Sequence, residues 1–418
     1  MSLFSSLMAS VSGMNAQANS LSTISDNIAN ANTVGYKQAG TQFEDMLNEF
    51  SPSEYNAGGV ATVVNYNISQ QGDPTSTTNS TNMAIEGNGF FVVQNASGQT
   101  FLTRAGSFAP NAQGDLVNAS GFTLMGYPIN SSSSQPPSYS LNQLVPVQIS
   151  TSALSPPVAS TTATLKGNLD SSASVDTGTL PAANSTSSTY TSMTPVTAYD
   201  SLGNPVTLNV YATKTGANTW EMDVYNAADA ASGGGFPYSA GPLSTTTLNF
   251  NATTGALTTP ASGSVSVAVS GTQTVNFSLS SLTQVSSATS VQGAANGNAP
   301  GTYESVSVSQ SGVLSETFSN GVTTPIYQIP LGTVPSVNSM TSMAGDVFSP
   351  NSASGNIQLG AANSQGFGTI NGSQLESSTV DLATQLTNMV VTQNSYQANS
   401  KAFQVGSDML SQLVNLLK

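Results

Sequence analysis

The feature that most constrains this chain is a seven-residue repeat of apolar side chains near its C-terminus. The repeat runs through Leu382, Met389, Tyr396, Phe403, Leu410 and Leu417. It places an apolar stripe along one face of a helix, and about forty residues at ~1.5 Å rise predict a rod roughly 60 Å long. Such a helix needs a partner that buries the stripe, because packing supplies most of the stability of a helix in a protein.

The N-terminus offers a partner helix with the same spacing. Its apolar positions at seven-residue intervals are Leu7, Met14, Leu21 and Ile28. We therefore expect the N- and C-terminal helices to pair as a coiled coil. The alternative is that both helices pack on a globular core. The flanking chain is poor in helix formers and rich in Ser, Thr and Asn, which leaves the two stripes few other places to pack.

Composition excludes several classes of function. Charged residues make up only 6% of the 418 residues, the net charge is −14, and no Lys/Arg cluster exists, which argues against nucleic-acid binding. Cys and His are both absent, which removes thiol chemistry, the usual zinc sites and His-based catalysis. We expect no cofactor, no metal and no catalytic residues. No apolar run could span a bilayer and no signal peptide is recognisable, so we expect no membrane insertion and export without a cleaved signal.

Between the termini, short alternations of apolar and polar residues predict β structure. The clearest hairpin alternates over 206–210 and 220–224, with a turn at 215–218. Residues 43–50 indicate a short helix, and Tyr66 indicates a strand. At the start of the last helix, we expect Ser377, Ser378 or Thr379 to be the N-cap, with Asp381 favouring the helix dipole.

Two motifs stand at opposite ends of the chain: SDNIANANTVGYK at 25–37 and LTNMVVTQNSYQANSKAF at 386–403. Both resemble the end motifs of bacterial flagellar axial proteins, the family of rod, hook and hook-associated subunits. A third motif, YDSLGNP at 199–205, resembles the outer domain of hook proteins, which the shorter rod proteins lack. The positions that carry the family motif are Asn27, Asn30, Gly35, Tyr36, Gln393, Tyr396 and Asn399.

The resemblance implies a mainly β fold with α-helical termini and two nested all-β domains between them. The expected parts are a terminal coiled-coil domain at 1–32 and 378–418, a connector at 33–72, a first β domain at 73–147 and 299–377, and an inserted outer β domain at 148–298. Such nesting brings the two ends of the chain together, so that the terminal helices can pair.

The resemblance also implies a structural subunit that polymerises into the flagellar hook, a flexible tube that transmits motor torque from rod to filament. The implied partners are other copies of the chain, the rod, the hook–filament junction protein, the hook cap and the flagellar type III export apparatus. The implied location is the extracellular hook at the distal end of the basal body. We expect the apolar repeats of both termini to carry self-assembly.

Three alternatives follow from the same residues. A distal rod subunit shares the end motifs but is much shorter. A secreted β-rich adhesin or surface protein fits the composition but not the paired seven-residue repeats. A hydrolase would need paired carboxylates. Asp200, Glu221 and Asp223 are candidates for such a pair, although turn and strand positions of this kind are common for surface residues.

Overall fold

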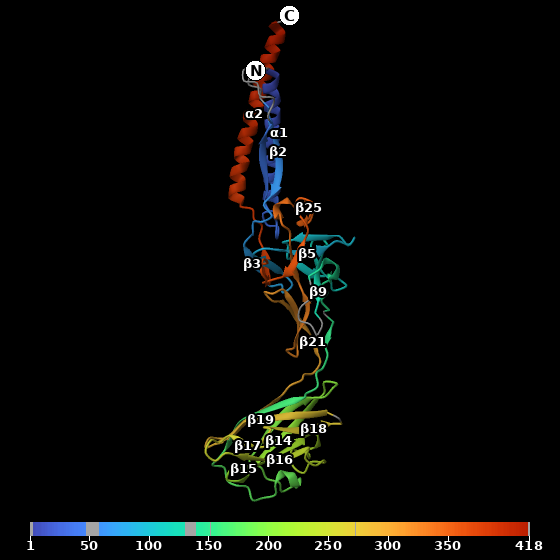
Figure 1. Ribbon diagram of the computed structural model, residues 1–418, viewed down its shortest axis with the longest axis vertical. Coiled ribbons are helices and arrows are strands. Elements are labelled where there is room, and N and C mark those ends of the chain that lie inside the picture. The colour runs from blue at the N-terminus through green and yellow to red at the C-terminus, as the bar shows by residue number, and fades with distance from the viewer. Residues whose placement is uncertain (1–2, 47–57, 130–138, 151, 272, 417–418) are drawn as a thin grey trace. The chain divides into compact units, whose positions relative to one another are not determined.

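The computed structural model describes residues 3–46, 58–129, 139–150, 152–271 and 273–416 (Figure 1). It is mainly β, with one long helix near each end: α1 (Leu3–Ala29) and α2 (Leu382–Leu416). The chain divides into two compact units. Unit 1 contains residues 1–151, 304–317 and 323–418, and unit 2 contains residues 152–303 and 318–322. The chain therefore leaves unit 1 to build unit 2 and then returns to unit 1.

The strands of unit 1 are short and antiparallel. Before the insertion they are β1 (Ala39–Asp45), β2 (Val60–Tyr66), β3 (Pro74–Ser76), β4 (Met83–Glu86), β5 (Phe90–Gln94), β6 (Thr100–Thr103), β7 (Phe108–Pro110), β8 (Leu116–Asn118), β9 (Thr123–Pro128) and β10 (Val145–Pro146). After it they are β23 (Thr323–Gln328), β24 (Pro330–Thr333), β25 (Thr341–Met343), β26 (Val347–Ser349), β27 (Gln358–Ala361), β28 (Thr369–Gly372) and β29 (Gln374–Glu376). Strands β21 (Gly301–Val308) and β22 (Val313–Phe318) have residues in both units.

Most strands of unit 2 are longer. The strands of this unit are β11 (Leu154–Ser155), β12 (Thr162–Asp170), β13 (Ser192–Tyr199), β14 (Pro205–Gly216), β15 (Thr219–Asn226), β16 (Ser244–Phe250), β17 (Leu257–Thr259), β18 (Ser264–Ser270), β19 (Gln273–Val285) and β20 (Ser290–Ala295). The described residues also form four short 3-10 helices, η1 (Leu141–Gln143), η2 (Pro181–Ala183), η3 (Ala227–Asp229) and η4 (Val337–Ser339).

In unit 1, α1 and α2 lie side by side and run antiparallel, and the β1–β2 hairpin lies along α1 (Figure 1). Hydroxyl groups fix the hairpin to the helix: Thr23 Oγ1 lies 2.7 Å from Thr41 Oγ1, and the backbone N–H of Val60 donates to Ser12 Oγ. The short helix expected at 43–50 is wrong in its described part, because residues 39–45 form a strand paired with 60–66. The pairing outweighs local helical spacing; residues 47–57 lie outside the described part.

The start of α2 also differs from expectation. The N-cap is Asp381, whose Oδ1 accepts a 2.7 Å hydrogen bond from the backbone N–H of Thr384. This backbone hydrogen bond is the main cause that lowers the pKa of Asp381. The expected caps are used elsewhere: Thr379 Oγ1 accepts from the N–H of Gln38 at 2.9 Å, which ties the segment before α2 to the segment after α1.

The core of unit 1 forms around β5, in which Phe90, Phe91, Val92 and Val93 are all buried. An uninterrupted apolar run of this kind is typical of a strand covered on both faces. Strand β5 pairs with β6, β9 and β24, so segments from before and after the insertion complete one sheet. The ring of Phe90, from before the insertion, packs edge-on against that of Phe348, from after it, and the two ring centroids lie 6.0 Å apart.

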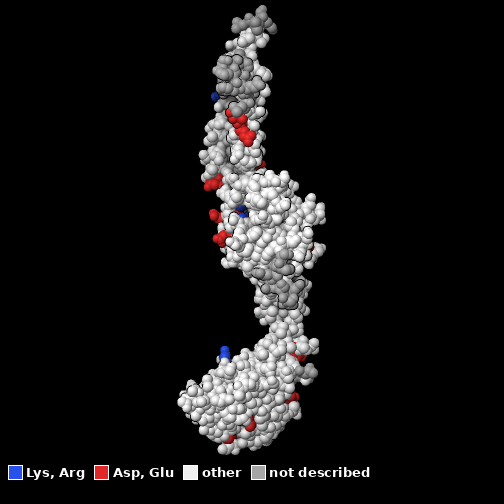
Figure 2. All heavy atoms as spheres, viewed as in Figure 1, with Lys and Arg blue, Asp and Glu red and all other residues white. Residues whose placement is uncertain are grey.

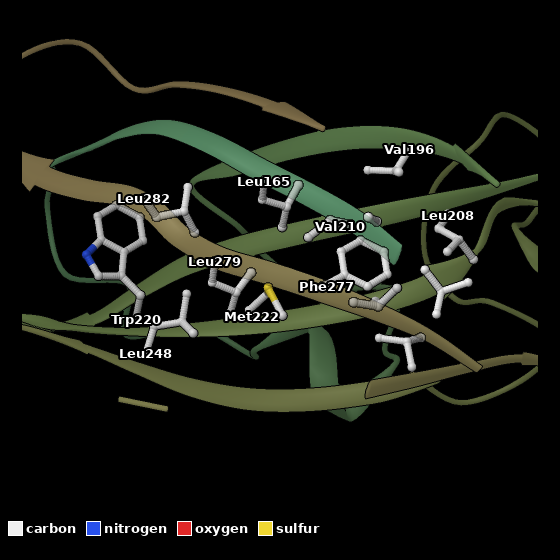
Figure 3. Close-up of a cluster of buried hydrophobic side chains, with 14 of the residues drawn as sticks. Leu165, Val196, Leu208, Val210, Trp220, Met222, Leu248, Phe277, Leu279 and Leu282 are labelled. Carbon is white, nitrogen blue, oxygen red and sulfur yellow. The ribbon is translucent and has the colours of Figure 1, made fainter. Parts of the chain in front are cut away.

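The core of unit 2 lies between a four-stranded sheet, ordered β18-β19-β12-β20, and a five-stranded sheet, ordered β13-β14-β15-β16-β17. Figure 3 shows side chains of both sheets meeting, with Trp220 and Met222 from one and Phe277 and Leu279 from the other. The predicted hairpin is confirmed: β14 pairs with β15 in a register that places Val210 opposite Val224. Since alternate residues of β15 enter this core, the intervening residues face the opposite side of the sheet.

Candidate functional site on the paired terminal helices

On α2, the contact with α1 is made by polar and small residues at seven-residue spacing. On α2 the buried positions are Gln385, Thr392 and Gly406, with Asn399 half-buried between them. Asn399 lies against Gly13 of α1, where a Cβ atom would stand 2.8 Å from its side-chain nitrogen. A Cβ atom on Gly406 would likewise stand 2.8 Å from Leu7. Small residues at these points allow the two helices to approach closely.

Three of the predicted apolar positions on α2 are exposed rather than buried in this contact. Leu382 and Tyr396 are 46% and 43% exposed and Phe403 is 37% exposed, whereas Met389 and Leu410 are half-buried. On α1 the predicted positions, which are Leu7, Met14, Leu21 and Ile28, are all half-buried. Leu417 lies outside the described residues. Within one copy of the chain, therefore, the apolar stripe is only partly covered, and its role in self-assembly stays a prediction.

Asn27 of the N-terminal motif is a buried centre of hydrogen bonds. Its side-chain oxygen accepts from the N–H of Ala39 at 2.9 Å and from the Tyr36 hydroxyl at 3.2 Å. Its side-chain nitrogen donates to the Ala39 carbonyl at 2.8 Å and to Gln385 Oε1 at 3.2 Å. One amide therefore joins α1, β1 and α2. Burial raises the pKa of Tyr36 to about 12, so this hydroxyl stays neutral and can donate.

The other residues of the two end motifs lie in different surroundings. Gly35 has φ +73°, and a Cβ atom there would stand 2.6 Å from the backbone of Ala105, so only glycine fits this close approach. Asn30 closes the end of α1, donating to the Asp26 carbonyl at 2.9 Å and accepting from Thr33 at 3.1 Å. On α2, Gln393 and Tyr396 are exposed, and only Asn399 of the three C-terminal motif residues faces α1.

A buried ion network joins the helix pair to the β sheet of unit 1. Lys37 Nζ lies 2.5 Å from Glu376 Oε1, and Arg104 Nη1 lies 3.2 Å from Glu376 Oε2. All three side chains are at most 5% exposed. Lys37 follows α1, Arg104 follows β6, and Glu376 precedes α2, so the network ties together three distant segments of the chain.

The network is completed by backbone groups. Arg104 also donates to the carbonyl of Gly87 at 2.7 Å, and its guanidinium lies over the ring of Phe90, 4.9 Å from the centroid. The N–H of Gly72 donates to Glu376 Oε1 at 2.8 Å. Burial lowers the pKa of both Lys37 and Arg104, and the carboxylate of Glu376 opposes that effect.

Sequence reasoning did not identify this network. The sequence did contain a signal for it. The chain has only 6 Lys and Arg residues, and one of these, Lys37, ends the N-terminal motif. A buried cation is costly unless it has a partner. The partner could not be named, because Lys37 and Glu376 are separated by 339 positions.

Four sequence families match the chain. Residues 7–37 match "Flagella basal body rod protein", and residues 84–161 match "Flagellar hook protein FlgE/F/G D1 domain". Residues 168–298 match "Flagellar basal body protein FlaE D2 domain", and residues 372–416 match "Flagellar basal body rod FlgEFG protein C-terminal". The helix pair and the nested β units therefore define the class of flagellar axial proteins.

Full-length relatives narrow this class. The flagellar hook protein of Brucella suis biovar 1 is 42% identical over 417 residues, covering all of both chains. That of Rhizobium meliloti is 41% identical, again covering all of both chains, and that of Escherichia coli is 32% identical over 97% of this chain and 98% of its own. The chain belongs to the flagellar hook protein family. A Helicobacter pylori flagellar hook protein structure has a similar fold, with a TM-score of 0.52 at 16% identity over 72% of this chain and all of its own.

The buried ion network gives a direct test of what holds the helix pair to the sheet. We expect Glu376→Gln to destabilise unit 1 by about 3–5 kcal/mol, because it leaves two buried cations without a counter-charge. Urea unfolding followed by circular dichroism measures the loss. Glu304→Gln, which neutralises an exposed carboxylate on β21, is the matched control and should change stability little. Equal losses in the two variants would contradict the structural role of the network.

Proposed function

We propose that this chain is the subunit of a flagellar hook, polymerising into a curved, flexible tube that carries torque from rod to filament. The observation that carries the proposal is the uncovered apolar surface of the helix pair. In a single copy, α2 exposes Leu386 at 54%, Val390 at 56%, Val391 at 58% and Val405 at 58%. Apolar surface repeated along a helix in this way calls for a partner. In a polymer, that partner is a neighbouring copy.

The low charge of the surface fits a bending joint. Figure 2 shows charged side chains of the described residues only as isolated points and small groups on the visible face. Contacts between short polar groups are numerous and individually weak, so neighbouring subunits can shift between arrangements at small energetic cost. A heterologous contact that does not close on itself generates a filament.

The parts of the chain have distinct places in this proposal. Helices at 1–32 and 378–418 form the inner tube, joined by the connector at 33–72 to the first β domain at 73–147 and 299–377. The inserted domain at 148–298 forms the outer shell. The partners we propose, beside further copies, are the rod, the hook–filament junction protein, the hook cap and the type III export apparatus, with export lacking a cleaved signal peptide. No helix among the described residues could cross a membrane.

The alternatives have less support. The relatives aligned over the whole chain are hook proteins, and the match over 168–298 covers the insertion that we expect a rod subunit to lack. No observation favours an adhesin. The relatives are structural proteins of the flagellum, and we infer that this chain has no catalytic activity.

Immunogold labelling of intact and extracted appendages, with antibody against residues 196–290, tests the proposed function. Label along a short curved segment between cell surface and filament is the expected result, because the inserted domain should lie on the outside. Label restricted to extracted rods would support the rod alternative instead. Absence of label from every appendage would contradict both the hook and the rod proposal and would support an adhesin.

A single charge in the apolar stripe should block assembly. We expect Phe403→Asp to abolish polymer formation, because a carboxylate would have to be buried between copies without a partner. Phe403→Leu, which keeps the position apolar, should still assemble. Electron microscopy of sedimented polymers gives the readout, and the fluorescence of the single Trp confirms that unit 2 remains folded. Normal polymers from the Asp variant would refute the proposed role of the stripe.

A further inference from the structure

Two acidic side chains stand next to each other on the outer face of the five-stranded sheet of unit 2. Along β15, Trp220, Met222 and Val224 enter the core, so Glu221 and Asp223 face the other side. Asp223 is fully buried and Glu221 is half-buried. They are two residues apart on the same face of β15, and the neighbouring Glu221 is one of the causes that raise the pKa of Asp223.

The neighbouring strands supply hydroxyl groups to this pair but no positive charge. Tyr211 and Thr213 of β14 and Thr245 of β16 lie beside the two acids in the sheet register. Thr245 donates to Asp223 Oδ1 at 2.6 Å. The remaining carboxylate oxygens, Glu221 Oε1 and Asp223 Oδ2, are buried without a hydrogen-bond partner, as is Thr213 Oγ1.

The ionisable groups packed around the pair are all tyrosines. Tyr211, Tyr225 and Tyr238 form a buried aromatic cluster over this face, with the Tyr211 and Tyr238 hydroxyls 2.8 Å apart. Burial raises the pKa of Tyr211 and Tyr225, so these rings stay neutral. The nearby cation, Lys214, is occupied: it is the register partner of Trp220 and donates to the carbonyls of Ser171 and Ala173.

Charge on both of these neighbouring carboxylates is costly in such surroundings, because neither burial nor repulsion is offset by a cation. One proton shared by the pair removes one of the two charges and supplies a donor to the unpartnered oxygens. From this geometry we infer that Glu221 and Asp223 hold a single proton between them, and that losing it loosens unit 2. The inserted unit is therefore a pH-sensitive module.

The direction of the pH effect follows from the fold. Burial, followed by the neighbouring Glu221, raises the pKa of Asp223 from its usual 3.8 to about 7. A carboxyl whose pKa is raised by folding stabilises the folded state fully at low pH, and this contribution is lost as pH rises toward the folded pKa. Unit 2 should thus lose stability as the pH rises from the usual pKa of 3.8 through the folded value of about 7.

The composition makes this effect easy to isolate. The chain has no His and no Cys, the side chains that most often titrate near neutrality. Other carboxyls with raised pKa, Glu316 and Asp346, belong to unit 1. The only Trp of the chain, Trp220, is buried in unit 2 beside Glu221 in sequence, so its fluorescence reports on unit 2 alone.

The test is thermal unfolding of the full chain, followed by Trp220 fluorescence at pH 5.5 and pH 8.5. We expect the wild-type midpoint to fall by on the order of 5 °C between these values. Asp223→Asn keeps the shape and replaces the shared proton with an amide donor, so its midpoint should stay nearly constant. Glu221→Gln provides a second variant of the same kind should the first not fold.

Asp200→Asn is the matched control. Its carboxylate caps an exposed turn, and hydrogen bonds with Asn204 lower its pKa, so this variant should keep the wild-type pH dependence. A wild-type midpoint equal at both pH values, or a fall that persists in the Asn and Gln variants, would overturn the inference. A midpoint raised by calcium chloride and restored by EDTA would also overturn it, because a metal ion would then hold the oxygens.

Discussion

The buried contact of Glu376 with Lys37 and Arg104 is the interaction on which unit 1 depends. It connects the end of α1, the first sheet and the approach to α2, which lie far apart in the sequence. Burying charges is costly unless each has a partner. The network therefore fixes the end of α1 and the approach to α2 against the first sheet. Asn27 extends the same constraint along the helices by joining α1, β1 and α2.

The helix pair inverts the usual distribution of side chains. On α2, polar and small residues, among them Gln385, Thr392 and Gly406, are buried, while large apolar residues such as Leu386 and Val391 are exposed. A monomeric protein would normally bury the apolar set. This arrangement keeps the pair together by close approach and hydrogen bonds, and it leaves the apolar surface for neighbouring copies in the proposed polymer.

Periodic features of the sequence predicted much of this fold. The paired terminal helices and the β14–β15 hairpin both follow from local spacing. The predictions that failed were those that depend on distant partners. Residues 39–45 form a strand because residues 60–66 pair with them. Asp381 caps α2 because Thr379 already accepts a hydrogen bond from the backbone of Gln38. The seven-residue spacing indicated a helix contact, but hydrophobicity alone pointed to Phe403 and Tyr396 rather than to the polar set. The pairing of Glu221 with Asp223 was visible as strand alternation, yet their burial depends on the tyrosines that cover them.

In the proposed hook, neighbouring copies of the chain cover the exposed apolar side of α2. Since the chain contains no Cys, Leu386→Cys introduces a single thiol on that side, and Ser201→Cys places one on an exposed turn of unit 2. The measurement is the rate of maleimide labelling in the monomer and in isolated hooks. We expect that the thiol at 386 reacts in the monomer and is protected in the hook, while the thiol at 201 reacts in both. Equal labelling at 386 in monomer and hook would contradict it.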